Sequence, residues 1–122
     1  MININYSIRN GHVTQDDGSL IATGWSGNHD GKDNVYMTSF HDVGPLPIGI
    51  YNIGPFITHP ILGPLSAQLT QISGETYGRS GFFIHGPGTT DYGQESKGCV
   101  ILTHDDRLKV IALNPAQLTV SA

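Results

Sequence analysis

Glycine and proline interrupt this sequence so often that no long helix or strand is expected. The 122 residues include 16 Gly and 7 Pro, and both residue types weaken or end regular elements. Asn and Asp, which favour turns, are scattered between them. The pattern predicts a mainly β fold in which short strands are joined by many turns.

The N-terminal third predicts two strands and a loop. Residues 2–8 alternate between apolar and polar side chains, which is the period of a strand with one buried face. A second strand is expected to follow, and an Asp-Asp-Gly turn at 16–18, which favours a hairpin, separates it from the segment 19–23. The segment 24–34 is rich in glycine and lacks periodicity, so we expect a loop there.

The rest of the chain predicts more short strands and one helix. Further strands are expected at 48–53, 66–72, 82–84, 100–102 and 117–120, with an irregular connection at 60–64. The helix is expected near 103–113, because Thr103 suits the N-cap and Pro115 prevents extension. Together these elements predict a single domain over 1–122, built as a compact mixed β-sheet or sandwich with one short helix.

Charge and hydrophobicity exclude several classes of partner. Six Lys and Arg against ten Asp and Glu give a net charge of −4, with no basic run, so nucleic acid is not expected as a partner. No segment reaches the roughly 18 apolar residues of a spanning helix, so we expect no membrane insertion. The N-terminus lacks the basic and apolar regions of a signal peptide, which predicts synthesis in the cytoplasm without a cleaved leader.

A histidine and the single cysteine carry the chemistry that the sequence suggests. His85 follows the apolar run 82–84, and Cys99 precedes the apolar run 100–102, so two strand ends could bring them together. A cysteine attacks as the thiolate and needs a neighbouring base, a role that His85 could fill. Gly98 would let a carbonyl approach the backbone, with the N–H groups of Gly98 and Cys99 as candidate oxyanion donors.

A second hypothesis treats the cysteine as a packing residue. Free cysteine is often buried, and the chain would then be a non-catalytic small β domain that binds cell-wall peptide or a protein partner. The glycine before Cys99 and the His-Gly pair favour the enzyme, because packing requires neither. No metal site and no cofactor are expected, because the sequence lacks paired-ligand spacing such as C-x-x-C.

The residues around this pair resemble a known enzyme signature. Ile84-His85-Gly86 followed by Ser96-x-Gly98-Cys99-Val100 resembles the active site of the YkuD-type L,D-transpeptidases, bacterial enzymes that act on peptidoglycan stem peptides. The segments GWSG, GKDN, VGPLPIGIYNIGP, YGRSGFFIHG and SKGCVIL are similar to small type VI secretion effectors with an L,D-transpeptidase-like domain. The resemblance spans about 24–102.

The resemblance implies a role for each residue of the signature. Cys99 would be the nucleophile, and His85 the general base that later protonates the leaving amine. Ser96 would hydrogen-bond near the thiolate or support the loop, and a backbone carbonyl would orient the imidazole. Lys97 stands where the housekeeping enzymes usually have a second histidine, which argues against that subgroup.

Four residues are candidates for binding the substrate. Arg79 could pair with a stem-peptide carboxylate or form a structural salt bridge. Tyr77 could line the cleft or the core. Gly86 and Lys97 flank the proposed catalytic pair in the sequence.

The resemblance also implies an activity and a setting. The activity would be L,D-carboxypeptidase or L,D-transpeptidase action on the stem tetrapeptide, including D-amino-acid exchange. The setting would be that of an antibacterial type VI secretion effector in the periplasm of a target bacterium. A cognate immunity protein would then be a partner, and a secretion-system component another.

Overall fold

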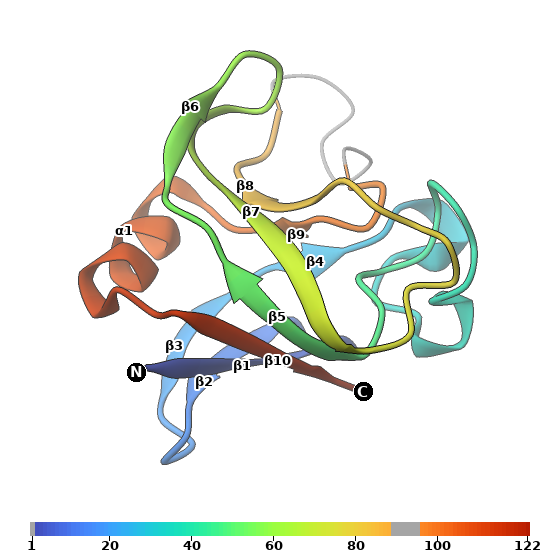
Figure 1. The fold of residues 1–122 in the computed structure, drawn as a ribbon, viewed down its shortest axis with the longest axis horizontal. Coiled ribbons are helices and arrows are strands. Elements are labelled where there is room, and N and C mark those ends of the chain that lie inside the picture. The colour runs from blue at the N-terminus through green and yellow to red at the C-terminus, as the bar shows by residue number, and fades with distance from the viewer. Residues whose placement is uncertain (1, 89–95) are drawn as a thin grey trace.

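The computed structural model describes residues 2–88 and 96–122, and within them it is mainly β with one α-helix (Figure 1). The first half holds β1 (Asn3–Ser7), β2 (His12–Gln15), β3 (Leu20–Thr23), β4 (Trp25–Ser26), the 3-10 turns η1 (His29–Gly31) and η2 (Val35–Met37), and β5 (Gly49–Ile53). The second half holds β6 (Ile57–His59), β7 (Gly63–Gly74), β8 (Phe82–His85), β9 (Val100–Ile101), α1 (His104–Leu113) and β10 (Gln117–Ser121).

The strands of the described residues form one continuous sheet. Their order is β3-β2-β1-β10-β5-β7-β8-β9-β4, and β6 pairs with β7 beside this path. Two pairings are parallel, β1 with β10 and β8 with β9. The sheet is therefore mixed, as expected, and the β8–β9 pairing joins the two segments that flank His85 and Cys99.

The expected strands are present, but the sheet has more strands than the sequence indicated. The turn at 16–18 joins β2 to β3 in an antiparallel hairpin, as the Asp-Gly signal predicts. β2 contains one apolar residue, Val13, so it has no visible alternation. The expected loop at 24–34 contains β4 and η1, and the expected irregular connection at 60–64 includes the start of β7.

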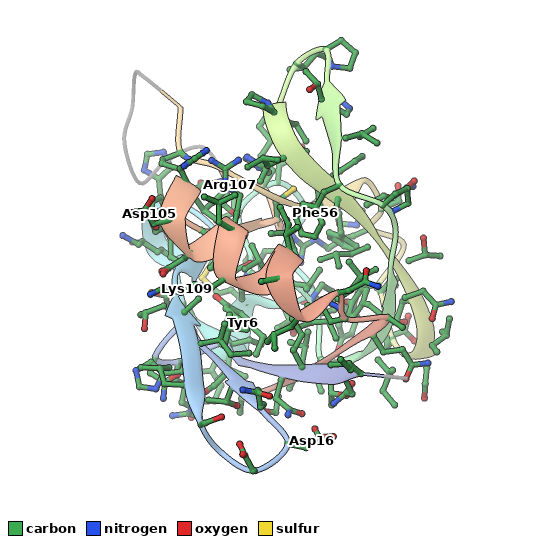
Figure 2. All side chains as sticks on the ribbon, turned by 90° about the vertical axis from the view of Figure 1, so that its left-hand side faces the viewer. Tyr6, Asp16, Phe56, Asp105, Arg107 and Lys109 are labelled. Atoms are coloured by element: carbon green, nitrogen blue, oxygen red, sulfur yellow. The ribbon has the colours of Figure 1, made fainter. Side chains whose placement is uncertain are left out.

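The core is built mainly from strand residues, and α1 adds Val110 to it. Alternate residues of the central parallel pair are buried, with Ile4 and Tyr6 on β1 facing the same side as Leu118 and Val120 on β10. α1 packs against β3 and buries Val110 and Arg107. Figure 2 shows this helix in front of the strands. No helix in the described ranges is long and apolar enough to span a membrane.

The helix begins and ends where its sequence predicts. Thr103 is the N-cap, and its hydroxyl accepts a hydrogen bond from the Asp106 N–H at 3.3 Å. Asn114 adopts the left-handed conformation at the C-cap, with φ of 49°. Pro115 follows directly and cannot continue the helix.

Removing the N-cap hydroxyl should destabilise the fold. We expect Thr103→Ala to lower the free energy of unfolding by about 1 kcal/mol, because the N–H of Asp106 loses its acceptor. Urea denaturation followed by circular dichroism measures this change. Thr103→Ser is the matched control and should stay near wild type; an equal loss in both variants would contradict a capping role.

Candidate active site

Parallel pairing of β8 with β9 places His85 beside the cysteine. Ile84 pairs with Val100 and His85 with Ile101, so the register brings Cys99 next to Phe83. Because side chains alternate along a strand, Phe83 and His85 project to the same face of β8. The Phe83 N–H donates a hydrogen bond to Cys99 Sγ at 3.3 Å. The structure thus brings the two expected chemical groups to the same face of the β8–β9 pair.

His85 and Cys99 line one cavity of about 260 Å³. Its described lining comes from the β6–β7 hairpin, the approach to β8, β8 itself and the cysteine loop: His59, Ile61, Leu62, Gly81, Phe83, His85, Lys97 and Cys99. Sequence reasoning missed the three hairpin residues. They reach the cavity because β6 pairs with β7. The sequence showed only turn residues in this region and gave no signal for that pairing.

The thiol of Cys99 is largely buried, with 8% of the residue exposed. Sγ accepts from the Phe83 N–H and lies 3.7 Å from the Gly81 carbonyl oxygen, to which it can donate. Burial raises the pKa of the Cys99 thiol to about 11, while the Phe83 N–H and the Arg79 charge act in the opposite direction. The resting cysteine is therefore a thiol at neutral pH, which differs from the expected thiolate.

The imidazole of His85 is held by the backbone. His85 is 4% exposed, and its Nδ1 lies 2.8 Å from the Gly86 carbonyl oxygen. Because a carbonyl can only accept, the neutral ring carries its proton on Nδ1 and keeps a lone pair on Nε2. This is the protonation state that a general base needs, with a backbone carbonyl as the orienting group.

Ser96 shapes the loop that presents the cysteine. Its fully buried hydroxyl donates to the Cys99 carbonyl oxygen at 2.6 Å and accepts from the N–H groups of Gly27 at 2.8 Å and Gly98 at 3.3 Å. The side chain of Asn28 also donates to the Ser96 carbonyl oxygen at 2.6 Å. Since the Gly98 N–H is engaged, the Cys99 N–H is the candidate oxyanion donor that remains of the expected pair.

Arg79 lies behind this loop and is 6% exposed. Its guanidinium donates to four backbone carbonyl oxygens, those of Thr38, Gly44, Pro45 and Lys97. It also lies over the Phe82 ring, 5.5 Å from the centroid. Among the described residues it forms no ion pair with a carboxylate, so its observed contacts organise backbone instead of the expected structural salt bridge.

Arg107 plays a similar part behind the histidine, and sequence reasoning did not single it out. Nη1 donates to the carbonyl oxygens of Pro64 at 2.7 Å and Leu65 at 3.3 Å. A Cβ on Gly86 would lie 2.5 Å from Nη2 of Arg107. Gly86 therefore allows this close packing, while its own carbonyl orients His85.

The remaining two predicted binding residues occupy different positions. Lys97 is exposed and lines the cavity with Cys99. Tyr77 is 46% exposed and is not part of that lining; its carbonyl oxygen lies 3.0 Å from Nε2 of His41. In the described part of the chain, no cluster of His, Cys, Asp or Glu could hold a metal ion.

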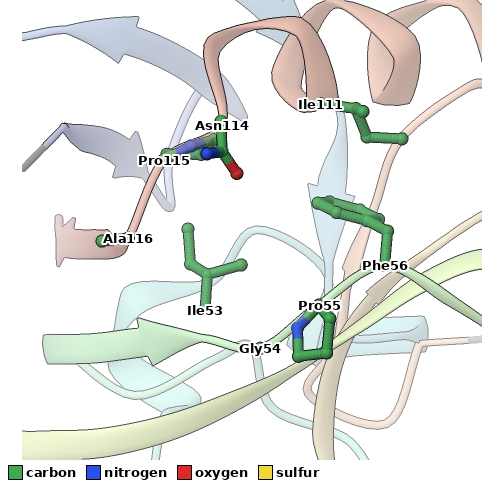
Figure 3. Close-up of a pocket in the computed structure, with 8 residues that line it drawn as sticks. All are labelled: Ile53, Gly54, Pro55, Phe56, Ile111, Asn114, Pro115 and Ala116. Carbon is green, nitrogen blue, oxygen red and sulfur yellow. The ribbon is translucent and has the colours of Figure 1, made fainter.

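A larger hollow of about 490 Å³ lies elsewhere, between the end of β5 and the end of α1 (Figure 3). Figure 3 shows Ile53, Phe56 and Ile111 around it, together with Asn114 and Pro115. None of its lining side chains is a nucleophile or a titratable group. We therefore assign the candidate active site to the smaller cavity.

The comparisons with known proteins agree with this architecture. A family model described as the Tlde1 domain matches residues 21–120. Comparison with curated proteins gives no significant match.

Solved structures share the fold at low identity. L,D-transpeptidase 3 from Mycobacterium tuberculosis, with a faropenem-derived adduct, has a TM-score of 0.57 and 15% identity over 99% of this chain and 60% of that chain. Helical cell shape determining protein Pgp2 from Campylobacter jejuni has a TM-score of 0.56 and 14% identity, covering 98% and 46%. The catalytic domain of an E. faecium L,D-transpeptidase acylated by ertapenem has a TM-score of 0.49 and 14% identity, covering 98% and 96%. The fold is that of an L,D-transpeptidase catalytic domain, and the chain spans less than two thirds of the first two proteins.

A side chain at Gly98 should disrupt the cysteine loop. Gly98 has φ of +120°, and an added Cβ would lie 2.6 Å from Nη2 of Arg79 and 2.9 Å from the Phe82 ring. We expect Gly98→Ala to lose about 2–4 kcal/mol of stability, from backbone strain plus overpacking. Gly18→Ala is the control, because Gly18 has φ of +89° and open space around its Cβ position. Urea denaturation showing no greater loss at Gly98 than at Gly18 would refute the packing argument.

Native Cys99 should react slowly with alkylating agents. With a pKa near 11 instead of 9.0, its thiolate fraction at pH 7–8 is about a hundredfold lower than that of a free thiol. Because the folded-state pKa is raised, stability also falls as pH rises from about 9 through about 11. Iodoacetamide labelling followed by mass spectrometry, with urea-unfolded protein as reference, measures the rates. A native rate that levels off below pH 9 would contradict the burial effect.

Proposed function

The chain belongs to the Tlde1 domain family, and from this premise we propose that it is a cysteine-dependent enzyme acting on peptidoglycan stem peptides, as an L,D-carboxypeptidase and L,D-transpeptidase. The observation that carries the proposal is that Cys99 and His85 line the same cavity, with Nδ1 of His85 engaged by the Gly86 carbonyl. This arrangement pairs a nucleophile with an oriented base, as covalent acyl transfer requires.

The proposed reaction begins with proton transfer from the thiol. As Sγ of Cys99 attacks the carbonyl carbon at the L-centre of meso-diaminopimelate, Nε2 of His85 takes the Sγ proton. The carbonyl oxygen becomes an oxyanion, which the Cys99 N–H can stabilise. Collapse breaks the amide bond, and His85 returns the proton to the departing amine of D-Ala. A thioester on Cys99 remains.

This sequence of events accommodates a buried, protonated cysteine. Burial favours the neutral thiol, with a pKa near 11, so the resting protein holds almost all of Cys99 as thiol. Substrate binding brings the electrophile and displaces water from the cavity, so deprotonation and attack take place together. His85 is then needed at both the acylation and the deacylation steps.

The acceptor decides the product. Water attacking the thioester gives the tripeptide, whereas the amine of a D-amino acid gives an exchanged tetrapeptide. Lys97 occupies the position of the second histidine of the housekeeping enzymes, so we propose that small acceptors are favoured over a second stem peptide. Both products pass through the same thioester on Cys99.

The setting proposed for this activity is that of an antibacterial effector. Membership of the Tlde1 family, a family of type VI effectors with an L,D-transpeptidase-like domain, supports secretion by that system. The enzyme would act in the periplasm of the target bacterium. Producing cells would need a cognate immunity protein to protect their own stem peptides.

One observation favours the second candidate, a non-catalytic β domain that binds cell-wall peptide. Cys99 is only 8% exposed and its pKa is raised, as for a packing cysteine. The two candidates differ in what they require of His85. If Cys99 only packs in the core, His85 has no role at this cavity. The enzyme, by contrast, needs His85 in the tautomer that leaves Nε2 able to accept a proton.

Incubation with purified stem tetrapeptide distinguishes the two candidates. We expect the wild-type protein to yield tripeptide and D-Ala, and to yield exchanged tetrapeptide when a D-amino acid is added, as measured by mass spectrometry. Cys99→Ala should abolish both products together. His85→Ala should lower the rate by about 10²–10⁴-fold, the range for loss of a general base.

His12→Ala is the matched histidine control, because His12 is exposed on β2 and is not one of the residues that line the cavity. It should retain wild-type turnover. Intact tetrapeptide after incubation with folded, reduced wild-type protein would exclude the enzyme. A 3-3 cross-linked dimer as the main product would overturn the assignment of the acceptor.

A further inference from the structure

His59 forms the hairpin side of the cavity that contains Cys99. It is the last residue of β6 and is half-buried. Its ring packs edge-on against the ring of Phe83, with centroids 5.0 Å apart and an interplanar angle of 73°. Phe83 in turn donates its backbone N–H to Cys99 Sγ at 3.3 Å. Phe83 thus lies between the imidazole of His59 and the nucleophile, and it contacts both.

Backbone hydrogen bonds fix the tautomer of this histidine. Nδ1 of His59 accepts from the N–H groups of Ile61 at 3.0 Å and Leu62 at 3.1 Å. Because Nδ1 accepts, the neutral ring carries its proton on Nε2. Nε2–H is the polar group of this side chain that is left for a ligand. His59 is therefore oriented as a donor, whereas His85 is oriented as a base.

The charge that the described lining residues bring to the cavity is positive. Lys97 contributes an ammonium group, and none of the described lining residues is Asp or Glu. The three other hairpin and strand residues of the wall, Ile61, Leu62 and Phe83, are apolar. In a chain whose net charge is −4, this cavity combines a cation and a fixed N–H donor. The ligand group that fits both is a carboxylate.

We propose that Nε2–H of His59 and the ammonium of Lys97 bind the free carboxylate of the residue that leaves the stem peptide. This rests on the proposed function, in which the departing D-amino acid carries its carboxylate next to the scissile amide. Binding there would hold the C-terminal residue beside Cys99. The site then selects peptides that end one residue after the scissile bond.

Two substitutions of His59 separate its structural and binding roles. His59→Asn keeps an acceptor near the position of Nδ1, because Asn Oδ1 can bond the N–H two residues on, but it removes the Nε2 donor. His59→Gln places an amide N–H near the position of Nε2 but loses the acceptor for the turn. Lys97→Met removes the charge and keeps the length of the exposed side chain.

The readout compares the tetrapeptide free acid with its C-terminal amide. In the Cys99→Ala protein, which cannot turn over the peptide, we expect calorimetry to show tighter binding of the free acid by about tenfold to hundredfold, the range for a hydrogen bond to a charged group. His59→Asn and Lys97→Met should each reduce that preference. His59→Gln should retain more of it, and His12→Asn and Lys109→Met, at residues outside the cavity lining, should leave it unchanged.

The outcomes also separate this proposal from the proposed function. Equal binding of acid and amide by the Cys99→Ala protein would overturn the carboxylate site, whatever the wild-type protein does. Preferential acid binding without turnover by the wild-type protein would support the site and exclude the enzyme. If circular dichroism shows that His59→Asn is unfolded, the Lys97→Met protein provides the test. An unchanged preference of that variant for the free acid over the amide would overturn the site.

Discussion

The parallel pairing of β8 with β9 is the constraint on which the rest of the site depends. Parallel neighbours cannot be joined by a tight hairpin, so the chain must leave the sheet after His85 and return at Cys99. The pairing of Ile84 with Val100 sets how far apart the point of departure at His85 and the point of return at Cys99 lie. The catalytic proposal therefore depends on a register: a slip by one residue would turn His85 to the opposite face.

Two buried arginines hold the polypeptide on either side of this pairing. Arg79 donates to the carbonyl oxygens of Gly44, Pro45 and Lys97. Arg107 joins α1 to the start of β7, through the carbonyl oxygens of Pro64 and Leu65. A buried guanidinium is costly unless its donors are satisfied, so each arginine favours the one backbone arrangement that supplies those carbonyls. The positive charge of Arg79 also opposes the effect of burial on the Cys99 pKa.

Local signals were readable from the sequence, whereas packing was not. Thr103 and Pro115 determine the ends of the helix by local hydrogen bonding and sterics, and both were readable. His85 and Cys99 could be paired because apolar strands flank them. His59 could not be placed, because it reaches the cavity through the pairing of β6 with β7. The burial that raises the pKa of Cys99 likewise follows from tertiary contacts.

The central claim is that Cys99 forms a thioester with the stem peptide, and trapping that thioester tests it most directly. Wild-type protein mixed with tetrapeptide, quenched in acid within the first turnovers and analysed by intact mass spectrometry, should gain the mass of the tripeptide acyl group. Peptide mapping should locate the added mass on Cys99. Conversion of tetrapeptide to tripeptide by the Cys99→Ala protein at the wild-type rate, with no adduct on wild type, would contradict the account.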